Sequence, residues 1–347
     1  SADIAAAMAQ LLQQASQGRA PDVAQVDSYI FPRFAKYASP VGAQLEEAGL
    51  ALDDWFPPFR EVMAAGGDVR GLQFTTDVRV LYYRKDMIDT PPTTFDEVIE
   101  TGRRLRERDL QFFFPAGRGE GAVATTVWPA YWPSGAEIVQ DGAPGFADGA
   151  GRDALVQVLE FVRRCIDEGI TPQRVSTYGA EDDVAQEVVA GRAGMFLGGN
   201  WQVALLQQLS GGKFADEWGV APIPNASGAD FATTAGGWLW GFFSKDEQVR
   251  EEAARFIVDG WVSDEGMAGW CNVGGYLPPR ASVFDVPAYK GNPFTPQFRE
   301  FLQSHARLRP GVENYADISA AVQVALSNVA SGQEKPAAAA DAARAAV

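Results

Sequence analysis

The chain has 347 residues and a formal net charge of −16 at pH 7, because 45 Asp and Glu outnumber 29 Lys and Arg. This acidic balance repels phosphate backbones and anionic lipids, which argues against a nucleic-acid or membrane-surface partner. Two cysteines and one histidine argue against a Cys/His zinc site and a CxxC pair, and a Ser/His/Asp triad could use only His305. The length favours two domains.

The first predicted element is a helix with Ile4, Met8 and Leu11 on one face, ending at Gly18. No basic n-region or cleavage site of a signal peptide precedes it. A buried strand follows at 23–26. Because an α/β domain seldom opens on a helix, we expect an earlier strand, with or without a leader before it, to be missing from the chain.

Strand and helix signals then alternate, which is the pattern of a wound α/β sheet. A β-rich stretch covers 78–83, and Thr94 and Glu97 form a capping box that begins the next helix. A long amphipathic helix is predicted over 151–168, with Gly169 after its end.

The second half continues the alternation. Residues 181–201 predict a helix, a glycine stop, a buried strand and a Gly-Gly-Asn-Trp turn. The remaining predicted elements are a strand at 238–243 and helices at about 246–262, 295–305, 315–331 and after Pro336. No long linker is present, so we expect the two domains to share several chain crossings, at 78–83, 235–241 and 280–286.

Two pairs of polar residues adjoin predicted strands. Asp27 and Tyr29 follow the strand at 23–26, and ligands bind outside the carboxyl ends of strands in open α/β sheets. Asp77 and Arg79 flank the start of the first crossing, where a carboxylate and a guanidinium suit a polyhydroxylated ligand. The alternatives are that Asp27 caps the next helix and that Asp77 and Arg79 form a salt bridge or strand cap.

Aromatic residues lie beside Gly and Pro in several segments. Trp128, Tyr131 and Trp132 are interrupted by prolines, and a sugar ring packs its C–H face on such aromatic planes. Core packing is the alternative for each of them. The neighbouring Glu137 either bonds hydroxyls or is solvated.

Two further turns place tryptophans after glycines, which allow a ligand or backbone to approach closely. These residues are Trp201 in GGNW and Gly236, Gly237 and Trp238 in AGGW, and core packing is again the alternative. A third motif, GGYLPPR, carries Tyr276 and presents Arg280 after two prolines, unless Arg280 is an ordinary surface residue.

The single histidine and the two cysteines carry no chemistry in this interpretation. His305 lies in a charged helical stretch and is expected at the surface. Cys165 and Cys271 are expected to be small buried hydrophobes with free thiols, although the sequence does not exclude a bridge.

The ordered motifs resemble the extracellular solute-binding proteins of ABC importers, in the sugar-binding branch that includes maltose- and trehalose-binding proteins. The matching segments are GRAPDVAQVDSY, TTDVRVLYYRKDMI with PPTTFDEV, SGAEIVQDG, GITPQRVSTYGAEDDVAQEVVAGRAGMFLGGNW, WGVAPIP, AGGWLWGFF, GGYLPPR and NPFTP, in the family's order over nearly the whole chain. The departure is at the front, where the family's first strand and helix start are absent.

The resemblance implies an α/β fold of the type II periplasmic-binding-protein class, with two lobes joined by crossing hinge strands that close around a sugar. The N-terminal lobe would comprise 1–80 and 241–282, and the C-terminal lobe 81–240 and 283–347. It implies a protein in the periplasm or on the outer face of a bacterial envelope, free or lipid-anchored, that delivers sugar to a membrane permease without catalysis, cofactor or metal. The acidic surface and the absence of an obvious apolar patch predict a monomer.

Carried over by position, the resemblance implies roles for individual residues. Asp27 and Asp77 would accept hydroxyl hydrogen bonds, and Arg280 would donate them. Trp201 and Trp238 would be stacking or wall residues, with the backbone of Gly236 and Gly237 close to the ligand. Tyr178, in VSTYGAEDD, is a weaker candidate.

Two other functions remain open from the sequence. A glycoside hydrolase would use two carboxylates, such as Asp77 with Asp27 or Glu137. A second possibility keeps the fold and changes the ligand to a polyamine, which suits carboxylates and aromatics, or to glycerol phosphate, which would need more arginines than Arg79 and Arg280.

Overall fold

The computed structural model describes residues 4–347, and its chain forms two compact units. Unit 1 comprises the chain up to Asp77 together with Ala235–Gly291 and Gly311–Glu313. Unit 2 comprises Val78–Thr234, Asn292–Pro310 and Asn314–Val347. The chain therefore changes units at 77/78, 234/235 and 291/292 and returns briefly at 311–313. The boundaries expected from the sequence lie at 80/81, 240/241 and 282/283.

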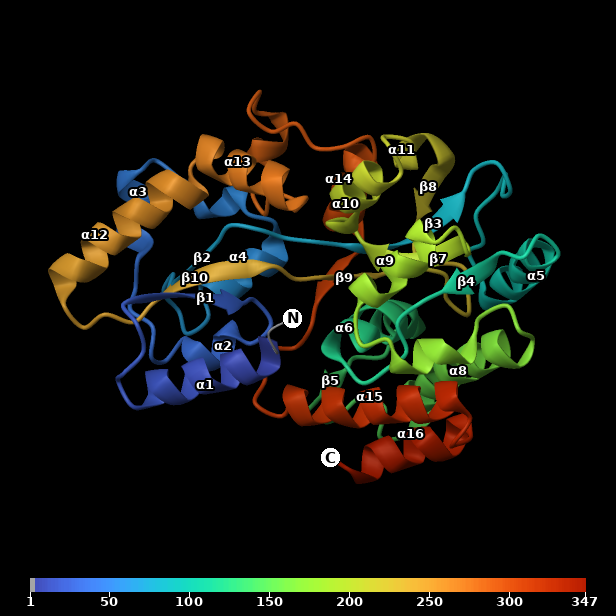
Figure 1. The fold of residues 1–347 in the computed structure, drawn as a ribbon. Helices are drawn as coiled ribbons and strands as arrows, with labels where there is room; N and C mark the ends of the chain where they lie inside the picture. The colour runs from blue at the N-terminus through green and yellow to red at the C-terminus, as the bar shows by residue number, and fades with distance from the viewer. Residues whose placement is uncertain (1–3) are drawn as a thin grey trace. The chain divides into compact units, whose positions relative to one another are not determined.

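Unit 1 contains a three-stranded sheet in the order β1-β10-β2, with both pairs antiparallel (Figure 1). The strands are β1 (Val23–Asp27), β2 (Gly71–Gln73) and β10 (Trp238–Phe242). The α-helices are α1 (Ile4–Ser16), α2 (Phe31–Phe34), α3 (Gly42–Glu47), α4 (Pro57–Met63), α12 (Glu247–Ile257) and α13 (Asp264–Gly274). Shorter turns are the 3-10 helices η1 (Leu52–Asp54) and η6 (Ser282–Asp285) and the π-helix η5 (Val258–Val262).

Unit 2 contains a four-stranded sheet in the order β4-β7-β3-β8, in which only β4 and β7 are parallel. Its strands are β3 (Arg79–Arg84), β4 (Gln111–Phe113), β7 (Ala193–Gly199) and β8 (Trp218–Ala221). Two smaller pairs are β5 (Val139–Gln140) with β6 (Ala143–Pro144), and β9 (Thr233–Ala235) with β11 (Ala306–Leu308).

Helices complete unit 2, and α15 and α16 lie side by side (Figure 1). The α-helices are α5 (Phe95–Arg106), α6 (Glu120–Ala122), α7 (Trp128–Tyr131), α8 (Gly149–Asp167), α9 (Glu181–Val189), α10 (Gln202–Leu209), α11 (Phe214–Glu217), α14 (Thr295–Ser304), α15 (Tyr315–Ser331) and α16 (Pro336–Ala345). The other turns are the π-helix η2 (Val123–Val127) and the 3-10 helices η3 (Trp132–Ser134) and η4 (Gln173–Thr177).

Local signals placed many of these elements correctly. The capping box at α5 is confirmed, since the Glu97 amide donates to Thr94 Oγ1 at 3.2 Å and Glu97 Oε2 accepts from the Thr94 amide at 3.2 Å. Helix α8 is also confirmed, and it ends before Gly169, whose φ is +69°. The helix predicted over 246–262 differs, because α12 ends at Ile257 and the chain continues as the π-helix η5.

Candidate functional site

In unit 1, Asp27 and Trp238 are direct partners across the antiparallel strands β1 and β10. Side chains of such partners lie on the same face of the sheet, so a carboxylate and an indole are adjacent here. Both residues are partly exposed. The Tyr29 amide donates to Asp27 Oδ1 at 3.4 Å, so Asp27 shapes the turn after β1; it is not the N-cap of α2, a position that Ile30 occupies.

Gly237, just before β10, allows the chain to approach the segment after β2. Gly237 has a φ of +104°, and a Cβ there would collide with the carbonyl oxygen of Thr75. Gln73 Nε2 donates to the Gly236 carbonyl at 3.1 Å, and the Trp238 amide donates to Thr75 Oγ1 at 3.0 Å. Gly237 is therefore needed for this close backbone contact, which is one of the two approaches, by ligand or by backbone, that the sequence indicated for the glycine pair.

Asp77 and Tyr276 lie next to the same segment. The Thr76 amide donates to the Leu277 carbonyl at 2.8 Å, and the Leu277 amide donates to the Thr76 carbonyl at 2.9 Å. This pairing brings Asp77, which is buried and follows Thr76, close in space to Leu277, the residue that follows Tyr276. Backbone pairing thus links Asp27, Trp238, Asp77 and Tyr276 in one region of unit 1.

Arg280, predicted to donate hydrogen bonds to a ligand, has its guanidinium engaged by residues of unit 1. Its guanidinium is buried in unit 1, where Nε donates to Asp54 Oδ2 at 2.8 Å and Nη1 lies 2.9 Å from Asp264 Oδ1. Nη1 also donates to the Val262 carbonyl at the end of the π-helix η5, at 2.8 Å. The guanidinium carbon lies 5.3 Å from the Trp55 ring centroid. This geometry disfavours Arg280 as a ligand donor and makes it a structural cation.

In unit 2, Arg79 and Trp201 form the second aromatic arrangement. Arg79 is the cross-strand partner of Gly199 in β3 and β7, and a Cβ at Gly199 would collide with the Trp201 ring. The indole therefore folds back over Gly199, and the Arg79 guanidinium carbon lies 4.8 Å from the ring centroid. Arg79 is buried, whereas Trp201 is partly exposed. Trp201 is thus the side of this pair that a ligand can reach.

Glu181 is a residue of this site that the sequence did not single out. It is only 4% exposed, and its carboxylate accepts hydrogen bonds from Arg79 Nε at 3.3 Å and Thr125 Oγ1 at 2.5 Å. Its position at the start of α9 was the only signal, and acidic residues are ordinary there. The partners come from segments 102 and 56 positions earlier, so no local pattern could reveal them.

The aromatic residues between prolines lie in the core, which was the alternative given for each of them and which corrects the prediction of Trp132 as a ligand contact. Trp128 and Tyr131 are fully buried and Trp132 is 3% exposed, because the segment folds as consecutive short helical turns instead of an open loop. Arg307 covers the Trp132 ring at 5.2 Å and pairs with Glu137 at 2.6 Å. The Trp132 ring is therefore engaged in packing, and the Glu137 carboxylate is engaged in an ion pair with Arg307.

Tyr178 also has its hydroxyl engaged inside unit 2. It bonds to the buried carboxylate of Glu187, which Arg174 and Arg192 also hold, and Arg174 Nε lies 3.2 Å from the hydroxyl. Burial and the neighbouring Glu187 raise the pKa of Tyr178. These contacts explain the position of the ring without a ligand.

The single histidine and the two cysteines are packed against other residues of the protein. His305 is half-buried against Phe231 and Phe301 and lies 3.5 Å from Glu300, so it is less exposed than predicted. Cys165 and Cys271 are buried free thiols. Among residues 4–347, no group of three or more His, Cys, Asp or Glu is arranged to hold a metal, and no helix has the length and apolarity to cross a membrane.

The family model for bacterial extracellular solute-binding proteins matches residues 1–297. The chain belongs to this family. The solute-binding protein is 23% identical over 205 residues to a maltodextrin-binding protein of Bacillus subtilis, covering 56% of this chain and 46% of that relative. It is 22% identical over 293 residues to a maltotriose-binding protein of Pyrococcus abyssi, covering 80% and 58%. The chain therefore spans about half the length of these curated relatives.

A solved structure shows the same fold. The maltose-bound MalE3 of T. maritima superposes with a TM-score of 0.83 at 23% identity, covering 97% of this solute-binding protein and 86% of that chain. The fold is thus that of a periplasmic binding protein, as the sequence predicted.

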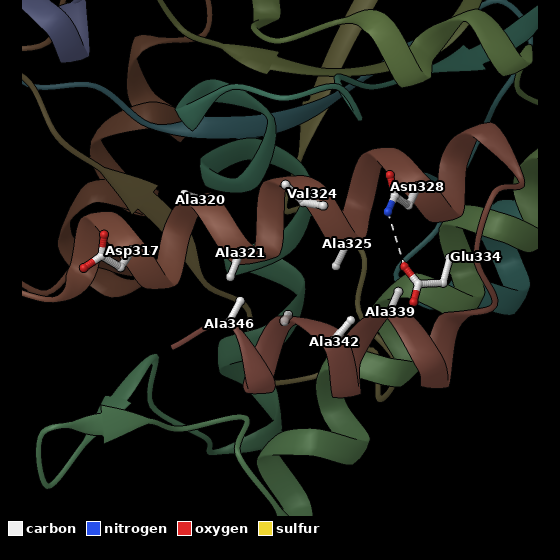
Figure 2. Close-up of a pocket in the computed structure, with 11 residues that line it drawn as sticks. Asp317, Ala320, Ala321, Val324, Ala325, Asn328, Glu334, Ala339, Ala342 and Ala346 are labelled. Carbon is white, nitrogen blue, oxygen red and sulfur yellow. Dashed lines mark hydrogen bonds between the residues drawn. The ribbon is translucent and has the colours of Figure 1, made fainter.

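A groove between α15 and α16 has a different character from the regions above. It has a volume of about 380 Å³ and is lined mainly by alanine methyl groups (Figure 2). Its polar lining consists of Asp317, Asn328 and Glu334, and Asn328 Nδ2 donates to Glu334 Oε2 at 3.3 Å. The groove lacks an aromatic plane, so it does not suit a sugar ring.

Proposed function

We propose that this solute-binding protein is a non-catalytic carbohydrate receptor that delivers its sugar to the permease of an ABC importer, outside the cytoplasmic membrane. The pairing of Asp27 with Trp238 on neighbouring strands carries the proposal. A sugar has hydroxyl groups, which donate hydrogen bonds to a carboxylate, and a C–H face, which packs on an indole. An adjacent carboxylate and indole can therefore bind both parts of one sugar ring.

Trp201 in unit 2 supplies a second partly exposed indole, supported by Arg79. Asp77, Tyr29 and Tyr276 are the further polar groups that we propose to contact the ligand. Affinity would come from desolvated stacking and charge-assisted hydrogen bonds, and neither requires an activated nucleophile. The ligands named for the two curated relatives make malto-oligosaccharides the first sugars to test.

The test is a thermal-shift screen followed by calorimetry with maltose, maltotriose, lactose, spermidine and glycerol 3-phosphate. A ligand that binds only the folded state raises the melting temperature by mass action. A rise with a sugar alone supports the proposal, whereas a rise only with spermidine or glycerol 3-phosphate overturns the ligand class. Release of new reducing ends from an oligosaccharide would overturn the non-catalytic assignment.

Two tryptophan variants test the site itself. Trp201→Ala and Trp238→Ala should each weaken sugar binding by about 1–3 kcal/mol, the range for losing a well-packed aromatic contact. Phe256→Ala is the matched control, because Phe256 is an aromatic residue of α12 that is 69% exposed. Calorimetry should give this control the wild-type Kd. Unchanged affinity in both tryptophan variants would place the site elsewhere.

A further inference from the structure

Glu181 places a carboxylate in the interior of unit 2, next to the Arg79–Trp201 pair. Its side chain is 6% exposed, and Arg79, its ion-pair partner, is 9% exposed. A buried carboxylate is tolerated only when charge and hydrogen bonds compensate for lost hydration. Thr125 Oγ1 and Arg79 Nε both donate to Oε1, and Gln202 Nε2 donates to the backbone carbonyl of Glu181 at 2.8 Å.

The surroundings leave this carboxylate little freedom. Thr125 lies within the π-helix η2, whose residues are all buried, so the hydroxyl comes from a rigid position. A Cβ at Gly121 would approach Glu181 Oε2 to 2.8 Å, which shows how closely α6 packs on the second oxygen. Gln202 also accepts from the Gly199 amide at 3.0 Å and so ties α9 to the end of β7, beneath the Trp201 ring.

Arg79 links this carboxylate to the indole. Its Nε donates to Glu181, its Nη1 donates to the Thr234 carbonyl at 3.2 Å, and its guanidinium carbon lies 4.8 Å from the Trp201 ring centroid. A guanidinium beside an aromatic ring is attracted by the ring quadrupole, but only in a suitable orientation. The bonds to Glu181 and Thr234 contribute to that orientation.

We propose that Glu181, held by Thr125, is a positioning residue that orients Trp201 for ligand stacking through Arg79. This inference rests on the proposed carbohydrate-binding function. It also explains why the sequence-predicted ligand residue Arg79 is buried, because its guanidinium supports the platform from within unit 2.

A double-mutant cycle on sugar affinity tests the proposal, with the sugar that stabilises the wild-type protein. Glu181→Gln keeps the shape and removes the charge, and it should weaken binding about 5–10-fold. In a Trp201→Ala background the same change should alter the Kd less than 2-fold, because the residue through which Glu181 acts is gone. Equal weakening in both backgrounds, or no weakening in either, would overturn the proposal.

Two further variants guard against a failure to fold. Thr125→Val removes only the hydroxyl and should weaken binding in the same direction by a smaller factor. Glu187→Gln is the matched control, because Glu187 is another buried, arginine-paired glutamate of α9 that does not contact the Trp201 support. Its Kd should equal that of the wild type. Weakening by Glu187→Gln as large as by Glu181→Gln would show a general effect of α9 stability and overturn the proposal.

A measurement without ligand separates this inference from the proposed function. The near-ultraviolet circular dichroism of the wild type minus that of Trp201→Phe isolates the Trp201 band. The corresponding difference in the Glu181→Gln background should be altered, whereas in the Glu187→Gln background it should match the wild type. An unaltered band in Glu181→Gln would overturn the positioning role. Failure of every sugar to bind would overturn only the proposed function.

Discussion

At the scale of single residues, Arg280 shows that a conspicuous sequence motif can place a side chain against structural partners. The Pro-Pro turn does place its side chain firmly, as the sequence suggested, but the guanidinium lies among Asp54, Asp264 and the Val262 carbonyl. Burial tends to raise the pKa of Asp54, and hydrogen bonds from Ser282 together with the charge of Arg280 lower it overall. The arginine thus compensates charge inside unit 1.

Substitution of Arg280 should therefore affect stability more than binding. Arg280→Ala leaves carboxylates without their cation and should destabilise the protein by about 2–4 kcal/mol in urea unfolding. Arg280→Lys keeps the charge but lacks the planar guanidinium and its paired N–H donors, so it should destabilise the protein less than Arg280→Ala does. Once folded, Arg280→Lys should bind sugar within 2-fold of the wild type. A 10-fold loss of affinity at unchanged stability would restore Arg280 as a ligand residue.

At the scale of elements, hydrogen bonds join the segments in which the chain changes units. In unit 1, Gln73 Nε2 donates to the carbonyls of Thr75 and Gly236, at 2.8 and 3.1 Å. In unit 2, Thr233 Oγ1 accepts from the Arg79 amide at 2.8 Å and donates to the Arg79 carbonyl at 2.7 Å. Each unit therefore holds its ends of the first two crossing segments together.

Gly237 is the position in these segments that tolerates substitution least. Gly237→Ala combines a positive φ with a collision against the Thr75 carbonyl. Gly142→Ala is the matched control, because Gly142 has a φ of +80° and nothing lies within 4 Å of the added Cβ. In urea unfolding, the control should lower the free energy of unfolding by about 1 kcal/mol because of backbone strain. Gly237→Ala should lower it by about 1–3 kcal/mol more. Equal costs would contradict the close approach of the two segments.

At the scale of the whole molecule, the net charge of −16 makes stability depend on how individual carboxylates are compensated. Glu187 is the clearest case in unit 2. Burial acts to raise the pKa of Glu187, but hydrogen bonds from Arg174, Tyr178 and Arg192 outweigh it and lower the pKa to about 2. The unfolded chain binds a proton at this glutamate near pH 4.3, so the native state alone keeps it ionised below that pH.

The stabilisation from Glu187 should therefore be complete above about pH 5 and decline as the pH falls towards 2. Glu187→Gln should be less stable than the wild type by about 1–3 kcal/mol at pH 7, and the difference should shrink below pH 4. Urea unfolding at pH 7, 5 and 3.5 measures this trend. The exposed Glu160→Gln serves as the control and should show no such pH-dependent difference. A constant difference for Glu187→Gln at all three pH values would contradict the low pKa.

The helices and strands that could be predicted from the sequence are those whose signals are local. Capping residues placed α5, amphipathic spacing placed α8, and runs of buried residues placed β3 and β7, because each signal acts within a few positions of the chain. The two Gly-Trp turns were identified for the same reason, since glycine beside a bulky ring marks a close approach.

Which of several similar aromatic residues face solvent was not a local property. Core packing was the alternative for both Trp132, beside a proline, and Trp201, in GGNW, yet Trp132 is covered by Arg307 and Trp201 remains partly exposed. Only the packing of distant segments separates the two. The same holds for Arg79, whose exposure depends on Glu181 at a position 102 residues later.

The sequence by itself determined the family, the fold class and most helices and strands, because family motifs, caps and periodicity are written in consecutive residues. The tertiary structure alone decided that Arg280 is buried beside Asp54, that Glu181 is paired with Arg79, and that Asp27 is paired with Trp238. These outcomes depend on burial and on strand register, which bring together residues that are far apart in the chain.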